Sequence, residues 1–266
     1  MTSTDPSPPV SSRYTSDRML TANGMRFRVL SSVPPDGSAS VGTATEFVLV
    51  HGIGTSHRYL ARLHDELART SVVHSVDLPG FGGLPKPSHS PTVEQMASAL
   101  GQALDLSGIG SSVLVGHSMG SQWVVELAVQ RPELAAAVIA MGPVADVAHR
   151  SLIGQGVRLA ADIAFEPPLV NAIVFADYLR CGTRWFLRQA IPMVDYPIER
   201  RIELIEAPVM ILRGGNDPIA VTGWCRRLRD ASESRLVVIP GQRHVVQQSA
   251  PRAVASAIRA FLLTVS

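Results

Sequence analysis

Short apolar runs alternate with longer amphipathic stretches along most of the chain. The apolar runs are rich in β-branched residues and bounded by Gly, Pro or Asp, a pattern typical of strands buried on both faces. They cover residues 25–30, 46–50, 71–76, 112–115, 136–141, 209–212 and 236–239. The helical patterns cover residues 59–70, 92–106, 119–130, 224–230 and 252–264. This alternation predicts an α/β fold with a mostly parallel sheet that helices cover on both sides.

Residues 143–204 break this rhythm, because they contain no good strand pattern and read as several short helices. Prolines divide the segment, and each disfavours continuation of the helix before it. They are Pro167, Pro168, Pro192 and Pro197. The aromatic residues of the segment are Phe165, Phe175, Tyr178, Trp185, Phe186 and Tyr196. We expect a helical lid (cap) subdomain at 143–204, inserted into a core of residues 19–142 and 205–266, over the carboxyl ends of the strands.

Residues 1–18 are rich in Ser, Thr and Pro, and we expect them to form a flexible N-terminal tail. They lack the apolar stretch of a secretory signal, and no other window is long and apolar enough to span a membrane. We therefore expect a cytoplasmic protein without a membrane partner.

The composition excludes several classes of protein. The chain is 46% hydrophobic and 17% charged, with a formal net charge of +2, which suits a globular domain and not a disordered one. No basic run with interleaved aromatics is present, so a nucleic-acid partner is not expected. Cys181 and Cys225 lie far apart without further Cys or His clustering, which speaks against a disulfide framework or a metal site. A single bridge between these two cysteines stays open.

The first chemical motif is Gly-His-Ser-Met-Gly at residues 116–120, directly after a predicted strand and directly before a predicted helix. A serine hydroxyl is a useful nucleophile only when it is exposed, loses its proton on attack and lies beside donors for an oxyanion. A sharp strand-to-helix turn exposes the hydroxyl, the small flanking residues relieve crowding, and the helix start contributes its positive dipole end. Ser118 is therefore the predicted nucleophile.

The second motif is His-Gly-Ile-Gly at residues 51–54, which follows the predicted strand 46–50. Its glycines let the backbone approach a ligand closely. We expect an oxyanion loop, in which the backbone N–H groups of Ile53 and Met119 hold the oxygen of a tetrahedral intermediate. One such donor typically lowers the activation free energy by about 3–4 kcal/mol. His51 is expected to order this loop by hydrogen bonding and not to act as a catalyst.

Two later strands are each followed by a loop that carries a titratable side chain. The motif RGGNDP contains Asp217, and the motif PGQRH ends at His244. Both loops leave the carboxyl ends of strands, the edge where Ser118 also lies, and the order Ser, Asp, His suits a nucleophile on a strand–turn–helix elbow. His244 is the predicted general base and Asp217 the acid that orients it. Asp146, which follows another strand, stays open as an alternative acid.

The other histidines receive non-catalytic roles. His117 lies beside the nucleophile and is expected to help hold the turn. We expect surface or capping roles for His57, His64, His74, His89 and His149. Asp77 stands in the turn sequence DLPG, where its carboxylate is expected to satisfy backbone N–H groups.

Taken together, HGIG, DLPGFG, GHSMG, GGNDP and a late histidine resemble the α/β-hydrolase superfamily, and the resemblance runs from about residue 20 to the end. It implies an eight-stranded, mostly parallel sheet, a helical lid after the sixth strand, and no cofactor. Ser118, Asp217 and His244 are similar to the family triad. Ile53 and Met119 are similar to its oxyanion donors.

The predicted reaction is hydrolysis of a carboxylic ester or lactone of a small, mostly apolar substrate through an acyl-enzyme. Trp185 and Phe186 in the lid, with Trp123 beside the elbow, are the candidate substrate-binding residues. Epoxide hydrolases and haloalkane dehalogenases of this superfamily carry aspartate where this chain has Ser118, so alkyl-enzyme chemistry is not expected. The sequence leaves a homo-oligomer open.

Other reactions stay as alternatives. Carbon–carbon bond hydrolases of ring-fission diketone acids usually carry asparagine before the serine and tryptophan after the histidine, whereas this chain has His117 and Val245. A carboxylate-binding arginine for that reaction would be Arg184 or Arg188. A thioesterase, a perhydrolase and a non-enzymatic ligand receptor complete the alternatives, and fold alone does not decide among them.

Overall fold

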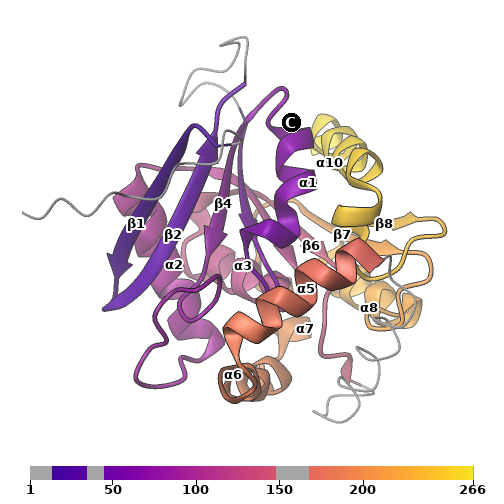
Figure 1. Ribbon diagram of the computed structural model, residues 1–266. Coiled ribbons are helices and arrows are strands. Elements are labelled where there is room, and N and C mark those ends of the chain that lie inside the picture. Colours follow the sequence, from indigo (N-terminus) through magenta and orange to yellow (C-terminus); the bar gives the residue numbers. More distant parts are fainter. Residues whose placement is uncertain (1–13, 35–44, 148–167, 266) are drawn as a thin grey trace, which may run out of the picture.

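A computed structural model describes residues 14–34, 45–147 and 168–265, and it shows one eight-stranded sheet (Figure 1). The strands are β1 (Ser16–Ala22), β2 (Met25–Ser32), β3 (Glu46–Val50), β4 (Val72–Asp77), β5 (Ser112–His117), β6 (Ala135–Met141), β7 (Val209–Gly214) and β8 (Arg235–Ile239). Their order across the sheet is β1-β2-β4-β3-β5-β6-β7-β8. β3 to β8 are parallel, and β1 and β2 form an antiparallel edge. The predicted α/β fold class is confirmed.

Helices cover both faces of this sheet. The described α-helices are α1 (His57–Leu67), α2 (Val93–Ser107), α3 (Met119–Gln130), α5 (Pro168–Cys181), α6 (Thr183–Asp195), α7 (Ile198–Arg201), α8 (Thr222–Ser232), α9 (Val246–Ser249) and α10 (Pro251–Val265). Side chains alternate along β3 between two core clusters: Phe47 and Leu49 belong to the cluster that also holds residues of α1 and α10, while Val48 and Val50 belong to the one that holds residues of α2, α3 and α8. The continuous apolar run of this strand is explained by burial on both faces.

The segment between β6 and β7 is helical where the structure describes it, and α5, α6 and α7 form what we call the insertion (Figure 1). Part of the expected lid, residues 148–167 with Pro167 and Phe165, lies outside the described residues. The insertion is joined to α3 by Glu126, whose buried carboxylate accepts hydrogen bonds from Tyr196 Oη (2.7 Å) and Arg201 Nε (2.8 Å). Burial and the neighbouring Glu126 raise the pKa of Tyr196, so its hydroxyl stays a donor.

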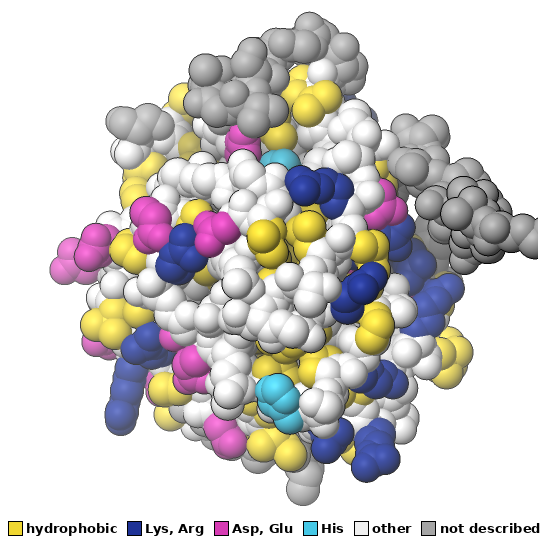
Figure 2. Space-filling view, turned by 90° about the vertical axis from the view of Figure 1, so that its left-hand side faces the viewer, with side chains coloured by type: hydrophobic (Ala, Val, Ile, Leu, Met, Phe, Trp, Pro, Cys, Tyr) yellow, Lys and Arg dark blue, Asp and Glu magenta, His cyan; other side chains and the backbone are white. Residues whose placement is uncertain are grey.

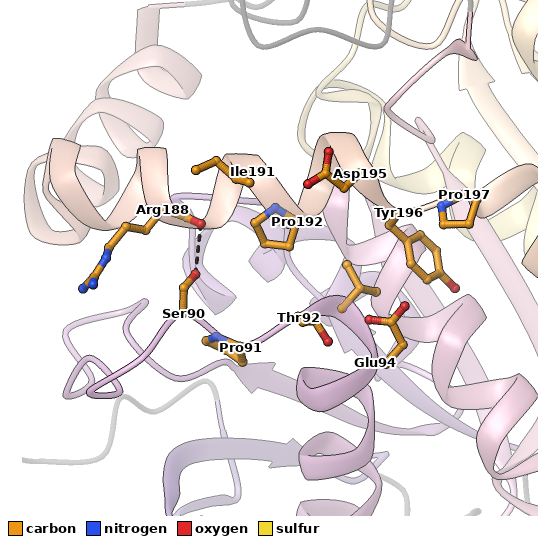
Figure 3. A pocket seen from close by; sticks show the side chains of 11 residues that line it. Ser90, Pro91, Thr92, Glu94, Arg188, Ile191, Pro192, Asp195, Tyr196 and Pro197 are labelled. Carbon is orange, nitrogen blue, oxygen red and sulfur yellow. Dashed lines mark hydrogen bonds between the residues drawn. The ribbon is translucent and has the colours of Figure 1, made fainter.

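Pro192 does not end a helix, contrary to the prediction, since α6 continues to Asp195. A proline leaves the carbonyl four residues before it without its helical N–H donor. Here that carbonyl belongs to Arg188, and Ser90 Oγ donates to it over 2.9 Å (Figure 3). Ser90 also accepts from Gln189 Nε2 (2.8 Å), so the Ser90 loop supports the proline turn of α6. These contacts lie at one end of an open cavity of about 440 Å³.

The boundary of the expected N-terminal tail is wrong by three residues. Residues 1–13 lie outside the described residues, but Ser16 to Arg18 belong to β1, which the sequence pattern missed. β1 is a half-exposed edge strand, so it lacks the apolar run of the central strands. The hairpin turn Asn23-Gly24 has φ values of 46° and 73°, a combination that Asn-Gly favours.

The surface seen in Figure 2 carries charges of both signs, interspersed with small hydrophobic groups, among the residues described there. Both cysteines are buried and unpaired, and burial raises the pKa of the Cys181 thiol to about 11. No helix in the described ranges has the length and apolarity needed to cross a bilayer.

Candidate active site

Ser118 stands at the sharp turn between β5 and α3, with φ 57° and ψ −124°. A non-glycine residue with positive φ is strained and persists only where the surroundings hold it there. The glycines of the motif are needed for space. A Cβ on Gly116 would collide with the carbonyl of Gly120, and a Cβ on Gly120 would collide with the carbonyl of Val50. The spacing of small residues around Ser118 is therefore a packing requirement of the turn.

Asp217 and His244 meet at the carboxyl ends of β7 and β8. His244 Nδ1 lies 2.9 Å from Asp217 Oδ2, and both side chains are almost fully buried. Asp217 Oδ1 accepts the backbone N–H groups of Ile219 (2.8 Å) and Ala220 (2.9 Å). Burial raises the pKa of Asp217, but His244 and these two N–H groups hold it below its ordinary value. The carboxylate is ionised, so Nδ1 carries the proton and Nε2 carries the lone pair.

His244 is also tied to the serine turn. His117 Nε2 donates to the backbone carbonyl of His244 over 2.9 Å, and the two rings lie 4.7 Å apart. The end of β6 contacts both residues. A Cβ on Gly142 would lie 3.0 Å from His244 Cε1, and the carbonyl of Met141, the residue before Gly142, accepts a hydrogen bond from the N–H of Ser118. The imidazole thus lies beside the turn that carries Ser118.

His117 has the supporting position that the sequence predicted. It is fully buried, and burial together with the nearby His244 lowers its pKa to about 3. The ring is therefore neutral and donates through Nε2. Its position directly before Ser118 lets it join the β5 turn to the loop after β8.

Asp146, the alternative acid, is placed in another contact. Its Oδ1 accepts from Arg227 Nη2 on α8 over 2.6 Å. Asp217 is the carboxylate that the structure shows against the Nδ1 atom of His244.

The loop 51–54 lies against Ser118. A Cβ on Gly52 would lie 3.0 Å from Ser118 Cβ and 3.5 Å from its Oγ. His51 orders the loop: the N–H of Leu78 donates to His51 Nε2 (3.1 Å), so Nδ1 carries the proton and donates to the carbonyl of Gly52 (2.7 Å). Burial lowers the pKa of His51, which keeps the ring neutral. The loop that carries Ile53 is thereby ordered beside the serine turn, and Met119 directly follows Ser118 as the first residue of α3.

The surface or capping prediction is wrong for three histidines. His57, His64 and His74 are buried, and each has a polar partner in the interior. His64 lies 2.8 Å from the hydroxyls of both Ser32 and Ser75. His89 is exposed, as predicted, and His149 lies outside the described residues. Polar partners that come from distant strands explain why the local pattern did not reveal these buried rings.

Asp77 accepts hydrogen bonds from His57, through the backbone N–H (2.6 Å) and through Nδ1 (2.7 Å). The predicted N–H contact is therefore present, but it comes from the first residue of α1 and not from the DLPG turn. Burial raises the pKa of Asp77, whereas His57 and His51 lower it, and the result lies below its ordinary value.

The depressed pKa values of Asp77 and Asp217 predict an acid-sensitive fold. Each carboxylate binds a proton less readily in the folded state than in the unfolded state. Their stabilisation is therefore complete above the unfolded pKa of about 3.8 and is lost as the pH falls through the lower folded values. We expect the free energy of unfolding in urea to fall as the pH drops below about 4. Asp77→Asn should make this pH dependence shallower, and an equal slope in the variant would contradict the assignment.

The candidate substrate-binding residues differ in exposure. Trp123 is fully buried behind the loop 51–54, with its ring near those of His51 and Phe81. Trp185 is 2% exposed and packs on Phe81. Among the described residues, the indole nitrogens of both tryptophans are buried without a hydrogen-bond partner. A substrate contact for either tryptophan stays a prediction.

Phe186 is partly exposed and packs against Tyr178, with ring centroids 5.2 Å apart. Both rings contact the loop 51–54 at Gly54. Arg184 and Arg188 are exposed on α6, and Arg188 also lines the cavity of about 440 Å³ in Figure 3. A carboxylate-binding role for either arginine stays a prediction. Over the described ranges, no group of three or more His, Cys, Asp or Glu side chains is arranged to hold a metal ion.

A protein-family model described as "Alpha/beta hydrolase family" matches residues 47–257, which is most of the chain. The chain belongs to this alpha/beta hydrolase family. Membership supports a hydrolase activity and confirms the resemblance drawn from the motifs.

Individual relatives of this chain are distant. The dihydrolipoyllysine-residue acetyltransferase component of the acetoin cleaving system of Pseudomonas putida is 29% identical over 241 residues, 82% of this chain and 63% of that protein. The chain thus spans less than two thirds of this relative's length. The solved enol-lactonase from Burkholderia xenovorans LB400 has a TM-score of 0.78 at 19% identity, covering 92% of this chain and all of its own. A thermophilic esterase from Thermogutta terrifontis has a TM-score of 0.77 at 21% identity, covering 94% and 99% of the two chains. At this identity the two structures show the fold alone.

Proposed function

We propose that this protein is a serine hydrolase that cleaves a carboxylic ester or lactone of a small, mostly apolar substrate. The observation that carries the proposal is the contact of Asp217 with His244 Nδ1, at the sheet edge where Ser118 stands on a strained turn. This contact sets the histidine tautomer that a general base requires.

The proposed reaction begins with attack by Ser118 Oγ on the ester carbonyl carbon, while His244 Nε2 takes the hydroxyl proton. The tetrahedral oxyanion is held by the N–H groups of Ile53 and Met119. Collapse breaks the ester bond, His244 returns the proton to the departing alcohol, and an acyl-enzyme remains. Water then loses a proton to His244 and attacks the acyl carbon, which releases the acid and restores Ser118. Asp217 stabilises the charged imidazole in both halves of the reaction.

The choice of an ester bond is supported by chemistry and by fold. The nucleophile position holds serine, which forms an acyl-enzyme, and the aromatic rings at Gly54 give the loop an apolar border. Two proteins of this fold are named as an enol-lactonase and an esterase, and a lactone is a cyclic ester. A cytoplasmic location, and the absence of a membrane or nucleic-acid partner, remain part of the proposal.

A substrate panel tests the bond type. We expect p-nitrophenyl esters and simple lactones to be hydrolysed, with the highest kcat/KM at short acyl chains because the proposed substrate is small. A ring-fission diketone acid serves as the competing substrate, measured by its loss of absorbance. Cleavage of the diketone alone would replace ester hydrolysis by carbon–carbon bond hydrolysis.

A further inference from the structure

Ser56 occupies the N-cap position of α1 but does not cap the helix. A serine there normally accepts a hydrogen bond from an N–H of the first turn. Within the described part of the chain, Ser56 makes no such side-chain bond, and its hydroxyl donates to Asp177 Oδ2 of α5 over 2.6 Å. The first N–H of α1, at His57, binds Asp77 instead. The Ser56 hydroxyl therefore serves a tertiary contact with the insertion.

Asp177 is buried, with a side chain 1% exposed, and it reaches α1 from the insertion. Its Oδ1 accepts from Arg58 Nη2 (2.9 Å) and Nε (3.2 Å), and Arg180 Nη1 lies 3.5 Å away. A buried carboxylate is strongly unfavourable unless it is paired and hydrogen-bonded. Asp177 therefore fixes α5 to residues 56–58.

The insertion also packs directly on the loop 51–54. Gly54 has φ 78°, and a Cβ there would meet Tyr178 Cε1 at 2.5 Å and Phe186 Cδ2 at 3.0 Å. On its other side the loop contacts Ser118 through Gly52. Contacts thus run without a break from α5, through the loop, to the proposed nucleophile.

A short, bonded segment joins Ser56 to the oxyanion loop. Thr55 Oγ1 donates to the carbonyl of Gly52 over 3.0 Å, and the N–H of Thr55 approaches the same carbonyl at 3.4 Å. The carbonyl of Gly52 and the N–H of Ile53 belong to the same peptide group. A shift of Ser56 would therefore pass through Thr55 to this peptide group and move the N–H of Ile53. Arg58 extends these contacts toward the proposed general base. Its backbone carbonyl accepts a hydrogen bond from Gln248 Nε2 of α9, which follows shortly after His244 in the chain.

We infer that Asp177 is a positioning residue, which couples docking of the insertion to the placement of the Ile53 N–H in the oxyanion hole. This inference rests on the proposed function of Ser118. Asp177 touches no reacting atom and acts through Ser56. Loss of the contact leaves the loop free to move away from the developing oxyanion, and small misplacements of catalytic groups are costly.

Two variants test the inference on p-nitrophenyl acetate: Ser56→Ala, which removes the hydroxyl, and Asp177→Asn, which removes the charge. We expect each to lower kcat by about 10-fold to 100-fold with KM changed less than about twofold. Affinity for a trifluoromethyl ketone, which forms a tetrahedral adduct with serine, should fall by the same factor as kcat. Ser56→Thr keeps the hydroxyl and should retain the wild-type kcat that Ser56→Ala loses. Asp195→Asn, an exposed carboxylate at the end of α6, is the matched control and should match the wild type.

The outcomes separate this inference from the proposed function. If Ser118→Ala stays active, the proposed function fails, and this inference fails with it. If Ser118→Ala is inactive but Ser56→Ala keeps its kcat and its ketone affinity, only the role of Asp177 is overturned. A fall in kcat without a parallel fall in ketone affinity also overturns it, since the oxyanion hole would then be intact. If Asp177→Asn does not fold, Ser56→Ala decides, because it leaves the ion pair of Asp177 with Arg58 in place.

Discussion

Ser118→Ala is expected to lower kcat for p-nitrophenyl ester hydrolysis by about 10⁶-fold, the loss seen when the nucleophile of a serine hydrolase is removed. The physical reason is that no other group can form the acyl-enzyme. Residual turnover should come only from the oxyanion donors and substrate binding. Steady-state kinetics measures the effect, and mass spectrometry after treatment with a fluorophosphonate should find the wild type modified at Ser118 and the variant unmodified.

The backbone at Ser118 allows a sharper version of the test. Ser118 holds φ 57°, a conformation that glycine adopts without strain. Ser118→Gly should therefore be as inactive as the alanine variant. Its free energy of unfolding in urea should be about 1 kcal/mol higher than that of the alanine variant, because glycine relieves the strain of the turn. Wild-type turnover in either variant would remove Ser118 from the reaction. Lower stability of the glycine variant would contradict the strain argument.

The elements that the sequence predicted share one property: their signal is local. Strands such as β3 are buried on both faces, so their apolar runs stand out, and the turn around Ser118 needs small residues at fixed spacing. β1 was missed because an edge strand buries few side chains, although Asn23-Gly24 is a hairpin signal that could have located it.

The polar interior could not be predicted in the same way. His64 is buried because Ser32 and Ser75, from two other strands, supply its hydrogen bonds. Asp177 receives its partners from α1, more than a hundred residues earlier in the chain. Whether a polar side chain is buried depends on such distant partners. The local pattern of polar and apolar residues cannot reveal these partners.

Pro192 shows that backbone hydrogen bonding can also depend on residues distant in the chain. A proline inside a helical pattern predicts a break, and the break is avoided because Ser90, from a separate loop, satisfies the carbonyl of Arg188. The position of His244 beside Ser118 was predictable in outline, since the carboxyl ends of parallel strands share one edge. Its support by His117 depends on how the loop after β8 returns to β5.

Asp217→Asn is expected to lower kcat by about 10⁴-fold near neutral pH, while the fold is retained. The surroundings dictate how the new amide would lie. The N–H groups of Ile219 and Ala220 both donate to Oδ1 of Asp217, so the amide oxygen would take that place and the NH₂ group would face His244. A donor against Nδ1 forces the proton of the neutral imidazole onto Nε2, which can then no longer accept the proton of Ser118.

Asp146→Asn is the matched control, because Asp146 is also buried at the carboxyl side of the sheet but is bound to Arg227. We expect its kcat to stay within about threefold of the wild type, since the tautomer of His244 does not depend on it. Steady-state kinetics of both variants at the same pH, with circular dichroism to verify folding, measures the contrast. The opposite result, an active Asp217→Asn beside an inactive Asp146→Asn, would transfer the role of the acid to Asp146. Equal losses in both variants would mean that the contact of Asp217 with Nδ1 does not alone set the tautomer.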